Sequence, residues 1–112
     1  MSKKTLSELV RYIKSYLAQR NLHLDRVILF GSHARGQARP DSDVDIAIVS
    51  DEFSGKDIFQ RARMMRGLHI SLTRRFSKPF DIVYLSNEEL SARESFLLDY
   101  VRQGRELPPN EF

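Results

Sequence analysis

The chain has 112 residues, 18 of them basic and 15 acidic, so it carries a formal charge of +3 and has room for one domain. It contains no cysteine, which excludes disulfides, thiolate metal sites and a cysteine nucleophile, and which is typical of a reducing compartment. No apolar run approaches the roughly 18 residues of a membrane span, so we expect a cytoplasmic protein without membrane contact.

The first half of the chain predicts a helix, a strand, a short helix and a second strand. Apolar residues recur at helical spacing from residue 6 to 17, and a capping-box pattern at Thr5 is expected to open this first helix. The run 26–30 reads as a buried strand that ends at a glycine. Residues 32–37 favour a short helix, and 44–49 form the second expected strand.

The second half predicts a long helix, a third strand and a last helix. The long helix is expected over about 56–74, and the third strand over 80–84. Ser86 begins another capping box, which opens a helix that Gly104 is expected to stop. The long helix has one apolar stripe, formed by Ile58, Ala62, Met65, Leu68 and Leu72. Residues 1–107 are expected to form the domain, and 108–112 a short flexible tail.

This order, αβ(α)βαβα, predicts an α/β (α+β) fold with a small three-stranded or slightly larger sheet flanked by helices. The connection 31–42 is short for a parallel crossover, which needs a dozen or more residues. The first two strands are therefore expected to be antiparallel, and a third strand joining them makes the sheet mixed.

The most informative pattern is Gly31-Ser32 followed ten residues later by Asp43-Val44-Asp45. A tight glycine turn offers backbone N–H groups to an anion, and the serine adds a hydroxyl donor. Asp43 and Asp45 project from one face, because side chains on a strand alternate. Hydrogen-bond donors for a phosphate, placed beside hard oxygen ligands, suit magnesium and a nucleoside triphosphate.

Asp81 is the best candidate for a third carboxylate, because an aspartate among apolar strand residues is costly unless it is paired or bound to metal. Two Mg²⁺ ions held by Asp43, Asp45 and Asp81 could activate an attacking oxygen and stabilise a leaving one. Alternatively, Asp81 is a strand-end residue that faces solvent, and Asp43 and Asp45 form a solvent-facing strand edge. Arg35 is either a surface residue or a partner for phosphate charge.

Charge is distributed unevenly along the chain. Residues 58–80 contain no acid and carry six basic side chains, five of them arginine. Such a stretch is either a solvated helix face or a surface that attracts a polyanion. No RNA-binding aromatic motif or helix-turn-helix signature accompanies it, so we do not expect nucleic acid as a direct ligand.

With these residues in view, the chain resembles the nucleotidyltransferase superfamily that includes the DNA polymerase beta palm, and most of all its minimal nucleotidyltransferases (MNT). The pattern Gly-Ser, then Ala-Arg-Gly, then Ser-Asp-x-Asp before an apolar strand is met without a gap. The resemblance implies that Gly31 and Ser32 hold the triphosphate of ATP or another nucleotide. It implies that Asp43 and Asp45 bind both metals with Asp81 as third carboxylate, and that Arg35 and Ser42 support nucleotide binding.

The resemblance also implies a partner. The residues after the third strand are too few for a second core, so the acceptor surface is expected from a second copy or from another chain in a hetero-oligomer. In the resembling family the partner is an all-helical HEPN protein, often a toxin, to whose tyrosine the MNT antitoxin transfers AMP. The competing hypothesis is a catalytically silent antitoxin that masks its partner by contact.

Overall fold

A mixed four-stranded sheet with strand order β3-β2-β1-β4 forms the centre of the structure, a computed structural model that describes residues 1–92 and 96–107. Strand β1 is antiparallel to both β2 and β4, whereas β2 and β3 are parallel. The elements in chain order are α1 (Lys3–Ala18), β1 (Arg26–Phe30), α2 (Gly31–Ala34), β2 (Val44–Val49), the 3₁₀ helix η1 (Asp51–Phe53), α3 (Ile58–Met64), α4 (Leu68–Phe76), β3 (Phe80–Leu85), α5 (Asn87–Ser91), α6 (Phe96–Arg102) and β4 (Arg105–Leu107).

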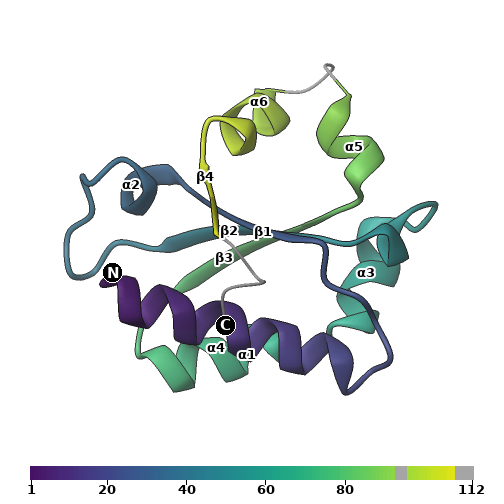
Figure 1. Ribbon diagram of the computed structural model, residues 1–112, viewed down its shortest axis with the longest axis horizontal. Helices are drawn as coiled ribbons and strands as arrows, with labels where there is room; N and C mark the ends of the chain where they lie inside the picture. Colours follow the sequence, from purple (N-terminus) through teal and green to yellow (C-terminus); the bar gives the residue numbers. More distant parts are fainter. Residues whose placement is uncertain (93–95, 108–112) are drawn as a thin grey trace.

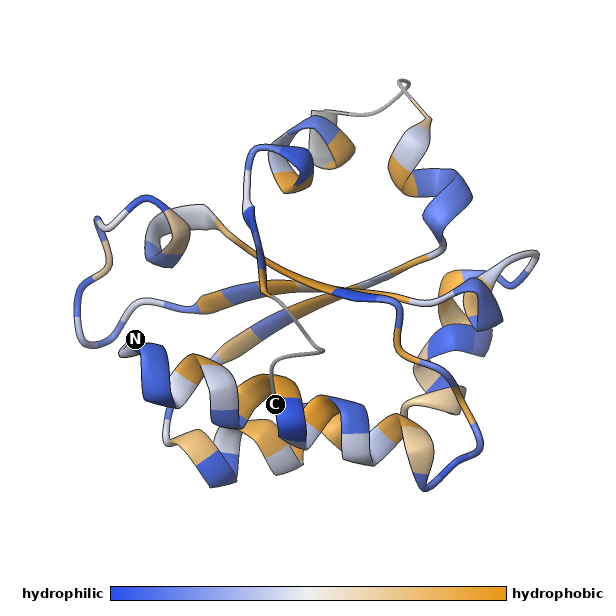
Figure 2. Ribbon diagram, viewed as in Figure 1, coloured by the Kyte–Doolittle hydropathy of each residue, from blue (hydrophilic) through white to orange (hydrophobic). Residues whose placement is uncertain are grey.

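Helices cover both faces of this sheet. Helices α1 and α4 run below it in Figure 1, and α5 and α6 lie above it. Alternation along β2 divides its side chains accordingly: Val44, Ile46 and Ile48 pack with α1 and α4, whereas Ala47 and Val49 pack with α5 and α6. Figure 2 shows the hydrophobic residues concentrated on the central strands and on parts of α1 and α4. No helix in the described part of the chain is long and apolar enough to cross a membrane.

The fold class and the strands predicted from the sequence are confirmed. The first two strands have the expected bounds and are antiparallel, and β3 makes the sheet mixed. The sheet has a fourth strand, β4, which agrees with the expected three-stranded or slightly larger sheet. The first helix begins earlier than predicted, because Ser2 caps it by accepting a hydrogen bond from the Thr5 N–H. The predicted tail 108–112 lies outside the described residues.

The long helix expected over 56–74 is wrong: the structure has two helices, α3 and α4. Gly67 lies between them with a φ of +90°, a left-handed conformation that interrupts a right-handed helix. The predicted apolar stripe is divided as a result. Met65, Leu68 and Leu72 are buried, whereas Ile58 and Ala62 are exposed.

The predicted last helix is also divided, into α5 and α6. Its start is confirmed, because Ser86 and Glu89 form a complete capping box. Helix α5 ends after Ser91, where Ala92 adopts extended backbone.

Candidate active site

Asp45 and Asp81 lie opposite each other on the neighbouring parallel strands β2 and β3. Residues paired in this way have their Cβ atoms on the same face of the sheet, and adjacent strands are about 4.8 Å apart. The face is the one that carries Ala47 and Val49, towards α5 and α6. The structure therefore brings Asp81 beside Asp45, as the sequence predicted, and Asp43 precedes them in the exposed loop that leads into β2.

The turn from β1 into α2 approaches Asp45 closely. Phe30, the last residue of β1, pairs with Asp45 in the antiparallel register. Gly31 follows with a φ of +70°, and a Cβ atom built on it would overlap Asp45 Oδ2. Only glycine combines this conformation with this approach. Backbone of the Gly31-Ser32 turn and the carboxylate of Asp45 thus share one small region.

This region concentrates negative charge. The pKa of Asp45 is raised above its usual value because the carboxyl is partly buried and because the charges of Asp81 and Asp43 lie nearby, while His33 opposes the rise. The Asp45 carboxylate is thus held beside two other carboxylates at an electrostatic cost. A bound cation would relieve that cost.

The loop before β2 is held in place by Ser42 and His33. Ser42 Oγ accepts a hydrogen bond of 2.8 Å from the Arg39 N–H, and the Ser42 carbonyl oxygen lies 3.2 Å from His33 Nε2. His33 Nδ1 is buried and has no hydrogen-bond partner among the described residues. Nothing in the spacing of His33 assigned it a role, and its only signal was its position two residues after Gly31. The role of Ser42 in nucleotide binding stays a prediction.

Arg35 links α2 to α6. Its Nη2 donates a 3.0 Å hydrogen bond to the Tyr100 hydroxyl, and its guanidinium lies 5.5 Å from the centroid of the Tyr100 ring. Tyr100 in turn packs edge-on against Phe30. Sequence reasoning missed Tyr100, because nothing in its spacing relates it to residue 35. Contact between Arg35 and a phosphate stays a prediction.

The carboxylates fit a divalent cation that also takes ligands from a substrate. Within residues 1–92 and 96–107, no group of three or more His, Asp or Glu side chains forms a ready metal cage. Mg²⁺ is usually held by one or two carboxylates together with substrate phosphates and water, so a complete protein cage is not required. The hard oxygen donors of Asp43, Asp45 and Asp81 match that chemistry.

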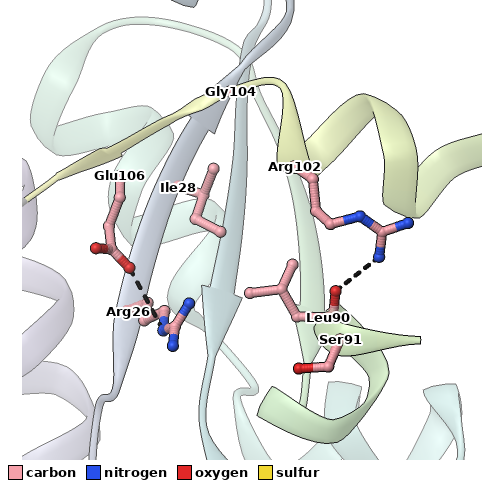
Figure 3. Close-up of a pocket in the computed structure, with 7 residues that line it drawn as sticks. All are labelled: Arg26, Ile28, Leu90, Ser91, Arg102, Gly104 and Glu106. Atoms are coloured by element: carbon pink, nitrogen blue, oxygen red, sulfur yellow. Dashed lines mark hydrogen bonds and ion pairs between the residues drawn. The ribbon is translucent and has the colours of Figure 1, made fainter. Parts of the chain in front are cut away.

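A separate cavity of about 380 Å³ lies on the same face of the sheet, at the opposite end of β1 (Figure 3). Ion pairing between Arg26 and Glu106 and a hydrogen bond from Arg102 to the Leu90 carbonyl oxygen cross its walls. It contains none of the predicted site residues. The candidate site is therefore defined by the aspartates and the glycine turn, and this cavity is not part of it.

Comparison with known proteins agrees with the family resemblance. The model of the nucleotidyltransferase domain family matches residues 10–104. A solved structure with the description minimal nucleotidyltransferase is 30% identical over 96% of each chain, with a TM-score of 0.57. A toxin-antitoxin with AMP-PNP and a mutant of the toxin-antitoxin MntA-HpeT are each 22% identical, over 87% of this chain and 70% of theirs, with TM-scores of 0.59 and 0.56. The search of curated proteins found no match.

Proposed function

We propose that this chain, which belongs to the nucleotidyltransferase domain family, is an antitoxin that transfers AMP from ATP to a hydroxyl of a partner protein. The partner in this proposal is a HEPN-type helical toxin, the acceptor is a tyrosine, and the reaction depends on Mg²⁺. The observation that carries the proposal is the pairing of Asp45 with Asp81 across β2 and β3, beside the Gly31 turn.

The mechanism assigns a separate task to each part of this arrangement. Backbone N–H groups of the Gly31-Ser32 turn and the Ser32 hydroxyl hold the triphosphate. Asp43 and Asp45 would hold Mg²⁺, which when bound stabilises the negative charge of the phosphates. Asp81 accepts the proton of the acceptor hydroxyl, whose oxygen forms a bond to the α-phosphorus while the bond to pyrophosphate breaks. The products are the adenylylated partner and pyrophosphate.

The solved relatives support the nucleotide and the partner. The toxin-antitoxin with AMP-PNP contains an analogue of ATP, and its fold is similar to that of this chain. The MntA-HpeT mutant carries two aspartates replaced by glutamate with a single residue between them, the spacing of Asp43 and Asp45. These likenesses support an antitoxin role, which requires its own test.

The test combines this chain, Mg²⁺, ATP labelled on the α-phosphate and the helical protein encoded beside it. We expect label on the partner, identified as AMP on tyrosine by mass spectrometry. Asp43→Asn should abolish the transfer, because a carboxamide is a poor ligand for Mg²⁺. Asp41→Asn is the matched control: Asp41 is exposed in the same loop, and its replacement changes the charge equally.

The same experiment separates catalysis from masking. If Asp43→Asn still inhibits the partner, and neither this variant nor the unchanged chain transfers label, contact alone neutralises the partner. Loss of inhibition together with loss of label would identify transfer as the active process.

A further inference from the structure

The outer edge of β3 is open. Strand β3 ends the sheet, and β2 is its one neighbouring strand among the described residues. The Val44 N–H donates to the carbonyl of residue 79 and the Ser50 N–H to that of Leu85, so the odd-numbered residues of β3 direct their backbone groups towards β2. Backbone groups alternate along a strand, so those of Phe80, Ile82 and Tyr84 point outward.

Side chains occupy the two ends of this edge. His69 Nε2 donates a 2.7 Å hydrogen bond to the Phe80 carbonyl oxygen, and Arg61 Nη1 donates one of 2.8 Å to that of Tyr84. Ile82 lies between them. Its outward N–H and C=O are therefore the pair left for an incoming chain.

Two cavities lie along this edge, and the second of them includes Asp81 in its lining. A cavity of about 270 Å³ is lined by Ile58, and one of about 290 Å³ is lined by Asp81. Both are lined by Ala62, Ile82 and Tyr84, so they adjoin along β3. Ile58 is 73% exposed, although it continues the apolar stripe that is buried at Met65. We call these two cavities together the β3 groove.

Two arginines line the β3 groove. Arg61 in the first cavity is buried and forms an ion pair with Glu89. Arg66 lines the cavity that contains Asp81, and it is exposed. An apolar groove with an exposed arginine beside it complements a segment that combines apolar and acidic side chains.

We infer that the β3 groove binds an extended, acidic segment of the acceptor protein and leads its hydroxyl to Asp81. This inference rests on the function proposed above and specifies where the acceptor docks. An apolar side chain of the segment contacts Ile58 and Ala62, one of its residues hydrogen-bonds with the Ile82 backbone, and its carboxylates face Arg66. The segment runs along β3 towards Asp81, which accepts the proton of the hydroxyl.

Two matched substitutions test the docking. Ile58→Asp places a carboxylate in the β3 groove, whereas Ile70→Asp places one at another exposed isoleucine, 58% exposed on α4, that lines neither cavity. We expect Ile58→Asp to raise KM for the acceptor protein at least tenfold, with kcat and the affinity for ATP within about twofold of the unchanged chain. Ile70→Asp should leave all three unchanged. An equal KM for the two variants would overturn the inference.

Crosslinking identifies the occupant. A photoreactive benzoylphenylalanine at Ala62, which lines both cavities, should capture an acidic peptide that contains or adjoins the labelled tyrosine, and the same group at exposed Lys14 on α1 should not. Capture of a second copy of this chain, or of RNA, would refute the assignment of the groove to an acceptor segment.

The two proposals fail in different ways. Label transfer with an unchanged KM in Ile58→Asp would refute the docking site and leave the transferase function intact. Acceptor binding that weakens only in Ile58→Asp, without any transfer by the unchanged chain, would refute the transferase function and keep the docking site.

Discussion

Replacing Gly31 with alanine tests whether the close approach of the turn to Asp45 is needed for the reaction. Gly31 has a φ of +70°, a conformation that costs an L-residue about 1–2 kcal/mol. The new Cβ would also overlap Asp45 Oδ2 and lie 3.1 Å from Asp45 Cγ, so the carboxylate must rotate away. Each kcal/mol lowers Tm by about 4–8 °C in a domain of this size.

Gly55→Ala separates the backbone cost from the effect on the site. Gly55 has a φ of +75°, but a Cβ there would meet no atom within 4 Å. Both variants should therefore lose at least about 1 kcal/mol of stability. Only Gly31→Ala moves the Asp45 carboxylate, and a displacement of about 1 Å at a reacting centre can cost a hundredfold in rate.

The assay measures urea denaturation and the rate of label transfer for both variants, at a temperature where each is fully folded. We expect Gly31→Ala to transfer AMP about a hundredfold more slowly than Gly55→Ala. Transfer rates within threefold of each other would refute the reasoning, because they would show that the position of the Asp45 carboxylate does not limit the reaction.

Three further predictions follow from the titrating groups. Burial and the two neighbouring aspartate charges raise the pKa of Asp45 above 3.8, so the folded chain loses stability as pH rises past that value. Asp45→Asn should therefore raise Tm at pH 7 in EDTA but not at pH 3. A lower Tm of the variant at pH 7 would contradict this. Partial burial raises the pKa of Glu89, but hydrogen bonds from the Ser86 backbone and from Arg61 lower it more, leaving it below 4.5. Glu89→Gln should therefore lower the free energy of unfolding by about 1 kcal/mol at pH 7, after allowance for solvent screening. The loss should shrink as pH falls through the lowered pKa, which urea denaturation at a series of pH values would measure. Burial, with a contribution from a neighbouring tyrosine, raises the pKa of Tyr84 to about 12. An ultraviolet titration should show a tyrosine that ionises near this pH and is lost in Tyr84→Phe. An unchanged titration curve in the variant would count against the buried position of this ring.

The central strands could be predicted because their sequences carry strong local signals. Arg26–Phe30 and Val44–Val49 are short apolar runs bounded by turn residues, and the short connection between them leaves only an antiparallel pairing. Strand β4 has no such signal, because a three-residue strand depends on pairing with β1 rather than on its own pattern. The break at Gly67 was missed because one glycine within a helical pattern is often tolerated.

The candidate site, like the fold, could be predicted only in part from the sequence. Asp81 was proposed as a third carboxylate on a neighbouring strand, and the register of β2 and β3 places it opposite Asp45. The expectation that Asp43 and Asp45 share a face came from strand alternation, but Asp43 lies in the loop before β2. The contact of Arg35 with Tyr100 could not be predicted, because it depends on how α6 packs over the sheet. The catalytic and binding roles of these residues stay predictions until the variants above are measured.

The way in which β3 ends the sheet also bears on self-association. An open strand edge is a template on which a second chain can pair, and repeated pairing leads to insoluble fibres. Here the imidazole of His69 and the guanidinium of Arg61 already occupy the carbonyl oxygens at positions 80 and 84. The edge can thus pair with a short segment of another chain, but it resists the continuous strand pairing that leads to insoluble fibres.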